Sequence, residues 1–357
     1  MTHQELPSYD QAPAGAIRFN TDSRKLEVYI GGPVGYGTLP NGQWMQVDSF
    51  TPEIATGGAR GVFGGGTPST NVIDYVNISS TGDAIDFGDL IDPTQSASTC
   101  SSSTRGVFGG GNVFPLSPPR TNVIQYITIS STGDAQYFGD LSIDKNNIAS
   151  CSNSTRGVFG GGVTPTPATT VLNTIEYITI SSTGDAIDFG DLSVGKSGLA
   201  SCSNSTRGVF GGGVTPTPAT TVLNTIEYIT ISSAGNASDF GDLSVGKNGV
   251  SACSNSTRGV FGGGRDPSYL NTIEYITISS NGDAIDFGDL SVGKTTIGAC
   301  SSSTRGVFGG GFFSPPTTRS NVIEYVNIMS TGNAVDFGDL TVGRNNAGGL
   351  SNGHGGL

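Results

Sequence analysis

The chain has 357 residues, a formal net charge of −12 at pH 7 and a pI near 4.4. Its acidic balance disfavours binding to phosphate backbones, so nucleic acid is not an expected partner. No apolar run reaches the roughly 18 residues that a membrane span needs. Glycine is frequent, at 56 residues, but it recurs at fixed positions, which indicates an all-β repeat protein rather than a disordered chain.

Three candidate strands precede the repeats: Ala16 to Phe19, Lys25 to Ile30 and Trp44 to Val47. The N-terminus lacks the basic and apolar blocks of a signal peptide, so we expect the chain to be made and folded in a cytosol.

The stretch from Gly15 to Asp22, with an Asn-Thr-Asp turn and a later Trp, resembles short β-hairpin modules of bacteriophage tail and appendage proteins. The resemblance covers about 35 residues and implies a docking element on a virion. Its anchors would be three aromatic side chains, although three aromatics in a small β segment also suit the segment's own core. These candidate docking residues are Phe19, Tyr29 and Trp44.

From residue 60 onward the segment Arg-Gly-Val-Phe-Gly-Gly-Gly occurs six times, at steps of 45, 51, 51, 51 and 47 residues. A variable loop of 4, 10, 10, 10 or 6 residues follows each of the first five Gly triplets, and without it every repeat has 41 residues. The chain therefore repeats one fixed unit that carries one adjustable loop. The repeat arginines are Arg60, Arg105, Arg156, Arg207, Arg258 and Arg305.

One unit, residues 200 to 247, contains four strand-length segments separated by turn residues. The third is apolar on both faces, so it needs a layer above and a layer below, which neighbouring units supply. The fourth carries aspartates, as expected at a sheet edge. The segments are Ser201 to Thr206, Gly208 to Phe210, Thr225 to Ser232 and Ala237 to Leu243.

Stacked four-stranded units of 41 to 51 residues predict a β-propeller. The order of a short small-residue strand, an Arg, an apolar strand ending in Gly-Gly and a Tyr-bearing strand resembles the kelch family of propellers. The resemblance covers residues 52 to 357, with Phe in place of the family's fourth-strand Trp. These phenylalanines are Phe87, Phe138, Phe189, Phe240, Phe287 and Phe337.

Ring closure has two solutions in the sequence. The constant repeat length places the start of a seventh unit at the C-terminus, so the favoured arrangement has seven blades. Its seventh blade would combine the three N-terminal strands with a strand within Gly348 to His354. The alternative has six blades and a separate N-terminal β module. The predicted domains are therefore an N-terminal β segment, 1–50, and a kelch-like propeller, 51–357.

The residues give little indication of catalysis. The only histidines, His3 and His354, lie near the termini, and no Ser-His-Asp order, His-Glu-x-x-His pair or Cys-x-x-Cys motif occurs. We therefore expect no enzyme, cofactor or metal site. Five cysteines share one repeat position and are expected to be small buried hydrophobes rather than disulfides. They are Cys100, Cys151, Cys202, Cys253 and Cys300.

Three other repeated features have structural interpretations. The Gly triplets fit close backbone packing and positive φ better than phosphate binding. The acidic segment around Asp185 to Asp191 fits a solvated edge better than a calcium site. The arginines are expected to pair with a neighbouring Asp or with carbonyl oxygens, rather than to bind an anion at a channel mouth.

The variable loops are the best binding candidates, because they leave one fixed point of each blade and should gather on one face. The alternative interpretation is that they are only Pro-stiffened connectors. The candidate binding residues are Phe114, Leu116, Thr164, Thr166, Thr215, Thr217, Tyr269, Phe312 and Phe313.

Residues 149–182 and 200–233 are identical, which indicates interchangeable blades rather than a catalytic pocket. We therefore predict a non-enzymatic structural protein of a bacteriophage virion, tail-associated or on the capsid surface. Its expected partners are other virion proteins and, through the loops, a host-surface glycan or protein. The alternatives are a cytosolic kelch-type interaction adaptor and, less favoured, a glycan-binding lectin.

Overall fold

The computed structural model describes residues 16–20, 25–30, 43–46, 59–114, 120–165, 170–216 and 220–357. The chain divides into two compact units, Met1–Thr56 and Gly57–Leu357. In the first unit three antiparallel strands form one sheet in the order β1-β2-β3. They are β1 (Ile17–Asn20), β2 (Lys25–Ile30) and β3 (Gln43–Gln46).

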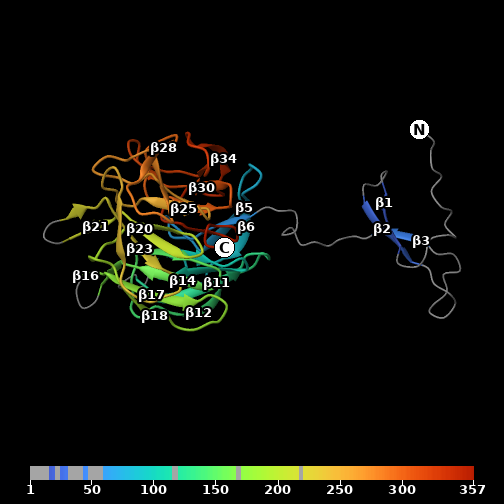
Figure 1. Ribbon diagram of the computed structural model, residues 1–357, viewed down its shortest axis with the longest axis horizontal. Coiled ribbons are helices and arrows are strands. Elements are labelled where there is room, and N and C mark those ends of the chain that lie inside the picture. Colours follow the sequence, from blue (N-terminus) through green and yellow to red (C-terminus); the bar gives the residue numbers. More distant parts are fainter. Residues whose placement is uncertain are drawn as a thin grey trace. The chain divides into compact units, whose positions relative to one another are not determined.

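The second unit is a six-bladed β-propeller (Figure 1). Each blade is a four-stranded antiparallel sheet, as the repeat predicts. From the axis outward, blade 1 is β35-β4-β5-β6, blade 2 is β8-β9-β11-β12 and blade 3 is β13-β14-β17-β18. Blade 4 is β19-β20-β23-β24, blade 5 is β25-β26-β27-β28 and blade 6 is β29-β30-β33-β34.

The strand bounds repeat from blade to blade. The inner strands are β35 (Gly348–Ser351), β8 (Ser98–Ser101), β13 (Ala149–Ser152), β19 (Ala200–Ser203), β25 (Ser251–Ser254) and β29 (Gly298–Ser301). The second strands are β4 (Arg60–Gly64), β9 (Arg105–Gly109), β14 (Arg156–Gly160), β20 (Arg207–Gly211), β26 (Arg258–Gly262) and β30 (Arg305–Gly309).

The third strands are β5 (Val72–Asn77), β11 (Val123–Thr128), β17 (Thr174–Thr179), β23 (Thr225–Thr230), β27 (Thr272–Thr277) and β33 (Val322–Asn327). The outer strands are β6 (Ile85–Asp89), β12 (Gln136–Asp140), β18 (Ile187–Asp191), β24 (Ser238–Asp242), β28 (Ile285–Asp289) and β34 (Val335–Asp339). Each outer strand pairs only with the third strand of its blade.

The six-blade alternative is confirmed, and the seven-blade arrangement is not. The first repeat begins at its second strand, β4, and therefore lacks an inner strand of its own. The C-terminal strand β35 fills that place, with Leu350 opposite Val62. The residues that look like the start of a seventh unit thus complete the first blade, and β1 to β3 pair with one another instead of joining them.

The hydrophobic core is divided into six clusters, one between each pair of adjacent blades. The third strand of each blade contributes to two of them, as its two apolar faces predict. In blade 4, Ile229 packs toward blade 3 and Ile226 packs toward blade 5. Because each blade supplies half of two clusters, no blade can bury its apolar surface without both neighbours.

Glycines allow the blades to approach closely. A Cβ on Gly160 would lie 2.9 Å from the ring of Phe210 in the next blade, and a Cβ on Gly157 would lie 2.4 Å from the sulfur of Cys100 in the preceding blade. Gly161 and Gly162 have φ of +72° and +101°, which turn the chain away from the second strand. The packing interpretation of the Gly triplets is confirmed.

A closed ring of serine hydrogen bonds joins the inner strands. Each hydroxyl donates to the serine carbonyl oxygen of the preceding blade at 2.5–2.8 Å, as Ser203 does to Ser152. Around most of the ring the same hydroxyl also accepts from that serine's backbone N–H. The six serines are buried: Ser101, Ser152, Ser203, Ser254, Ser301 and Ser351.

Two further hydrogen bonds recur at each of the six interfaces between blades. The repeat arginine stacks on the Tyr of its own blade and donates to a carbonyl oxygen of the next blade, as Arg156 does to Ile231 at 3.1 Å. An Asp or Asn in the turn before each outer strand accepts from a backbone N–H of the preceding blade, as Asp185 does from Asp140 at 3.0 Å. The expected arginine–carbonyl pairing is confirmed, whereas the Asp185 carboxylate is a structural acceptor as well as an edge charge.

Four of the interfaces contain a buried Lys–Glu ion pair. The Lys lies in the connection that enters a blade, and the Glu lies on that blade's third strand. The pairs are Lys145–Glu176, Lys196–Glu227, Lys247–Glu274 and Lys294–Glu324. At the interface between blades 1 and 2 the same positions hold Thr94 and Gln125, and Gln125 accepts from the backbone N–H of Ile91.

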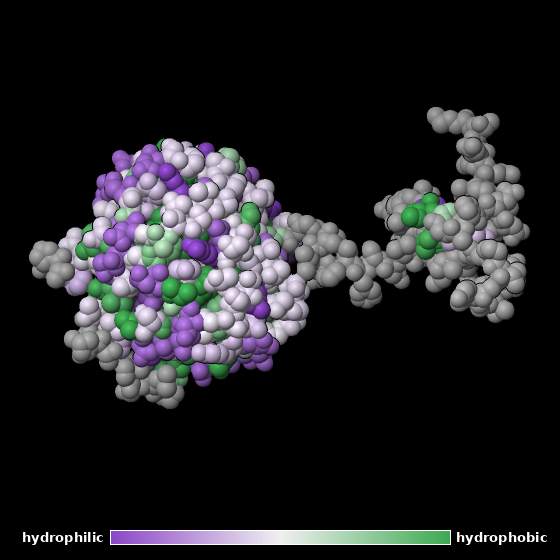
Figure 2. Space-filling model, turned by 60° about the horizontal axis from the view of Figure 1, so that its bottom comes forward, coloured by the Kyte–Doolittle hydropathy of each residue, from purple (hydrophilic) through white to green (hydrophobic). Residues whose placement is uncertain are grey.

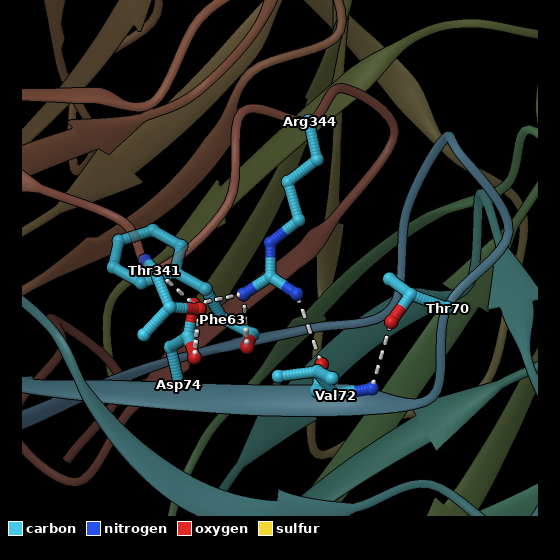
Figure 3. Close-up of polar contacts among 6 residues, drawn as sticks. All are labelled: Phe63, Thr70, Val72, Asp74, Thr341 and Arg344. Atoms are coloured by element: carbon cyan, nitrogen blue, oxygen red, sulfur yellow. Dashed lines mark hydrogen bonds and ion pairs between the residues drawn. The ribbon is translucent and has the colours of Figure 1, made fainter.

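The interface that closes the ring, between blades 6 and 1, carries Arg344 and Asp74 instead (Figure 3). The guanidinium lies 2.6 Å from the carboxylate and also donates to the carbonyl oxygens of Val72 and Phe63. Thr341 donates to the same carboxylate. A longer cation thus faces a shorter anion, so the contact spans the same gap as a Lys–Glu pair.

We expect Ser203→Ala to lower the free energy of unfolding by about 1–3 kcal/mol, because the Ser152 carbonyl and N–H lose their buried partner. Ser201→Ala is the matched control, since the Ser201 hydroxyl makes no hydrogen bond with the described residues and the residue lines the axial cavity. Urea denaturation of the full chain measures both. Equal stability of the two variants would contradict a role for the serine ring.

We expect Lys196→Met to destabilise the propeller by about 3–5 kcal/mol, because it leaves the Glu227 carboxylate buried and unpaired. Burial raises the pKa of Glu227, but the charge and hydrogen bond of Lys196 and the hydrogen bonds of Ser193 outweigh it and hold the pKa below its usual value. The pair's contribution is therefore present above pH 4.5 and is lost as the pH falls through the lower folded-state pKa.

The double variant Lys196→Met/Glu227→Gln should be at least about 2 kcal/mol more stable than the single variant, because it removes the unpaired charge. It approximates the neutral interface that the chain already uses at Thr94 and Gln125. The two variants and the wild type are compared by urea denaturation at pH 7. If the double variant were no more stable than Lys196→Met, charge pairing would not explain the effect.

Candidate functional site: the central channel and the loops

The inner strands line a channel on the propeller axis. One residue of each strand, the second, is partly exposed toward it, while the other three are buried. The channel contains cavities of about 60 and 140 Å³. No Asp, Glu, Lys or Arg is among their described lining residues. The six residues of this ring are Thr99, Ser150, Ser201, Ala252, Ala299 and Gly349.

The C-terminal tail covers one end of the channel. His354 Nε2 lies 2.9 Å from the Ser101 carbonyl oxygen, and Nδ1 accepts from the backbone N–H of Gly356 at 3.1 Å. Gly355 donates to the Ser254 carbonyl oxygen at 3.0 Å. Since Nδ1 accepts and Nε2 faces a carbonyl, this arrangement requires the neutral imidazole with its proton on Nε2.

At the other end, the connections between blades form a chain of backbone hydrogen bonds. Ser96 donates to Asn346, Asn346 to Thr296, Thr296 to Gly249, Gly249 to Gly198 and Gly198 to Asn147, at 2.8–3.1 Å. All six residues have φ between +52° and +66°. This conformation turns five of the six N–H groups toward the neighbouring blade, so backbone atoms, rather than reactive side chains, form this chain of contacts at the mouth of the channel.

The cysteines lie beside the channel and face the interfaces between blades. All five are buried and free, as expected. Burial raises the pKa of Cys151 and of Cys253 to about 12. A buried thiol with a raised pKa is a poor nucleophile and a poor metal ligand. Among the described residues, no group of three or more His, Cys, Asp or Glu side chains could hold a metal ion.

The variable loops join the second and third strands. Several form two-stranded hairpins that the sequence did not predict: β15 (Val163–Thr164) with β16 (Thr170–Val171), β21 (Val214–Thr215) with β22 (Thr221–Val222), and β31 (Phe312–Phe313) with β32 (Thr318–Arg319). In blade 2 the loop strand β10 (Asn112–Val113) pairs with β7 (Thr94–Gln95). The hairpins of blades 3 and 4 project from one side of the propeller (Figure 1).

The candidate loop residues differ in exposure. Phe114 is 45% exposed, whereas Thr164 and Thr215 are buried and contribute no side chain to a loop surface. Tyr269 and Phe312, from adjacent blades, stack edge to face with ring centroids 5.9 Å apart, and Phe313 is partly buried. Leu116, Thr166 and Thr217 lie outside the described residues. Figure 2 shows hydrophobic residues in separate small groups between hydrophilic ones on the face that it displays.

The candidate docking residues lie in the first unit. Tyr29 is 5% exposed, so it belongs to the unit's own core, and its backbone pairs with Trp44. The side chains of Phe19 and Trp44 lie outside the described atoms. Elsewhere, the described residues include no helix long and apolar enough to cross a membrane.

Sequence reasoning missed two features of this site. His354 was set aside because it stands near a terminus, yet the tail brings it onto the channel axis. The buried lysines and glutamates were also missed, although a Lys recurs at one position of repeats 2 to 5 and a Glu recurs beside the third-strand Tyr of repeats 3 to 6. This recurrence with an offset of one repeat is the signal that could have paired each Lys with the Glu of the following repeat.

Comparison with known proteins supports the fold alone. No protein-family model matches the chain, and no curated protein matches it. Many solved structures share its fold. One of them, titled "Structure of YjhT", has a TM-score of 0.59 and 14% sequence identity, over 73% of this chain and 88% of that one. The chain is therefore a β-propeller protein, and its function has to be argued from its own residues.

Acidification should loosen the C-terminal tail. Loss of hydration lowers the pKa of His354, although the hydrogen bond with the Ser101 carbonyl opposes the shift. The tail's contribution to stability is therefore full above pH 6.5, the ordinary value, and is lost as the pH falls through the lower folded-state pKa. Amide hydrogen exchange of Gly355 and Gly356 should become faster between pH 7.5 and pH 5, beyond the intrinsic effect of pH.

His354→Gln is the control, because Gln keeps a neutral donor and acceptor but does not titrate. Comparing the variant with the wild type also cancels any contribution from His3. A pH-dependent protection that persists unchanged in His354→Gln would exclude the imidazole as its cause.

Proposed function

We propose that this chain is a non-enzymatic structural protein of a bacteriophage particle, in which the propeller is a rigid body and the N-terminal unit is the docking element. The main support is the equivalence of the blades. The same serine, arginine and turn hydrogen bonds recur at all six interfaces, and the described lining of the axial channel contains no Asp, Glu, Lys or Arg. A scaffold requires such uniformity, whereas a catalytic pocket requires one blade to differ.

The division of the chain supports a separate role for the N-terminal unit. The propeller closes with β35, so β1 to β3 are not needed to complete any blade. The resemblance of this segment to tail and appendage modules suggests docking on a virion. The loops of the propeller are then available for contact with a host surface, and hairpins give the described parts of several of them a defined shape.

Mass spectrometry of purified particles tests the proposal. We expect the chain among the virion proteins, and its absence from particles of a phage that encodes it would contradict a virion role.

Deletion of residues 1–50 should leave the thermal transition of the propeller almost unchanged, because the ring is closed without them, and should abolish incorporation into particles. Incorporation of the truncated chain would contradict the docking role, and a collapsed transition would contradict the separate unit.

A further inference from the structure

A groove of about 400 Å³ lies on blade 6, where the turn between β33 and β34 passes the start of β30. Its volume falls within the range of small-molecule sites, roughly 300–1,000 Å³. The groove is lined mainly by hydrogen-bonding side chains. Among them are Arg305, Tyr325, Asn327, Ser330, Thr331 and Asn333.

The two asparagines present donors to this groove. Asn333 Oδ1 accepts from the backbone N–H of Asp289 at 3.0 Å, and Asn327 Oδ1 accepts from the backbone N–H of Met329 at 3.2 Å. Their carbonyl oxygens are thus engaged, while neither Nδ2 donates a hydrogen bond within the described part of the chain. An amide held through its oxygen in this way still has both N–H groups to donate to a ligand.

Arg305 supplies the only charge among the lining residues. Its guanidinium lies 4.5 Å from the Tyr325 ring centroid, and Nη1 donates to the Ile78 carbonyl oxygen at 3.0 Å. The equivalent Arg207 shows what such an arginine can bind in addition, because its Nη1 also donates to Asn281 Oδ1 at 3.0 Å. A repeat arginine that is held by a carbonyl can therefore take a second oxygen atom.

Only blade 6 has an asparagine at both positions, because blade 4 combines Asn236 with Thr230 and blade 1 combines Asn77 with Asp83. The position of Asn333 is Asp in four of the six blades, where its carboxylate accepts the same backbone hydrogen bond. On a chain with a net charge of −12, this groove combines an arginine, two amide donors and hydroxyls with no Asp or Glu among its lining residues. Such a set of donors is complementary to an oxyanion.

We propose that this groove binds an oxyanion group carried by a saccharide, such as the carboxylate of an acidic sugar. The oxyanion would accept from Arg305, Asn327 and Asn333, and the hydroxyls of Ser330 and Thr331 would contact the sugar. The inference rests on the proposed function only for the source of the ligand, an acidic host-surface polysaccharide. Binding by the purified chain does not depend on whether the protein is part of a virion.

The experiment titrates the full chain with glucuronic acid and follows the Asn side-chain amide resonances by NMR. We expect the resonances of Asn327 and Asn333 to shift, and glucose, the neutral probe, to bind at least about tenfold more weakly. Asn333→Asp should weaken glucuronic acid binding by at least about tenfold, because it places a carboxylate beside the anion. The variant should still fold, since Asp makes the same hydrogen bond in four other blades.

Asn236→Asp is the matched control. It changes the net charge equally and keeps the equivalent hydrogen bond to Asp191, but it lies in blade 4, so binding should be unchanged. Inorganic phosphate and sulfate are titrated in parallel. If they bind as tightly as glucuronic acid, the oxyanion site is supported and the saccharide is overturned. Equal binding of glucose, or full binding by Asn333→Asp, would overturn the site, as would the absence of any shift.

Discussion

The hydrogen bond from each inner-strand serine to the serine carbonyl of the preceding blade is the contact that the rest of the propeller depends on. It joins adjacent blades at the axis, where they are closest, and it runs unbroken through all six. Farther out, the arginine–carbonyl and turn hydrogen bonds fix the same pair of blades at a larger radius. Contacts at several radii define the angle between two blades, and repetition of one angle closes the ring.

The buried ion pairs show how much variation an interface accepts. Lys196 and Glu227 can be replaced by Thr94 and Gln125 at the equivalent interface, so charge itself is not required. At the interface that closes the ring, Arg344 and Asp74 replace Lys and Glu, so a longer cationic side chain meets a shorter anionic one. What all six interfaces retain is an acceptor for the backbone N–H that follows the outer strand. This is the behaviour expected where an unpaired buried charge costs far more than a neutral contact of the same size.

The repeat period, the four strands, the two-faced third strand and the buried cysteines were predictable from the sequence because each is a local pattern. The blade number was not, because the strand at Leu350 has the same residues whether it starts a seventh blade or completes the first. Only its pairing with Val62, almost the whole chain away, separates the two. For the same reason the site was predicted poorly. The position of His354 depends on the path of the tail, and the donors of Asn333 depend on which of its atoms the neighbouring blade engages.

The turn before each outer strand explains how a uniform scaffold can carry a local function. The interface needs one oxygen atom there, and Asp and Asn supply it at the same distance of 3.0 Å, as Asp185 and Asn333 do. The second polar atom of the side chain is not needed by the interface, so it can be a carboxylate oxygen in one blade and an amide N–H₂ in another without loss of the shared contact. Charge at this position is therefore free to vary from blade to blade while the ring stays intact. A single substitution there changes the charge of a groove without changing the fold, as Asn333 does in blade 6 where the neighbouring blades have Asp283 and Asp83.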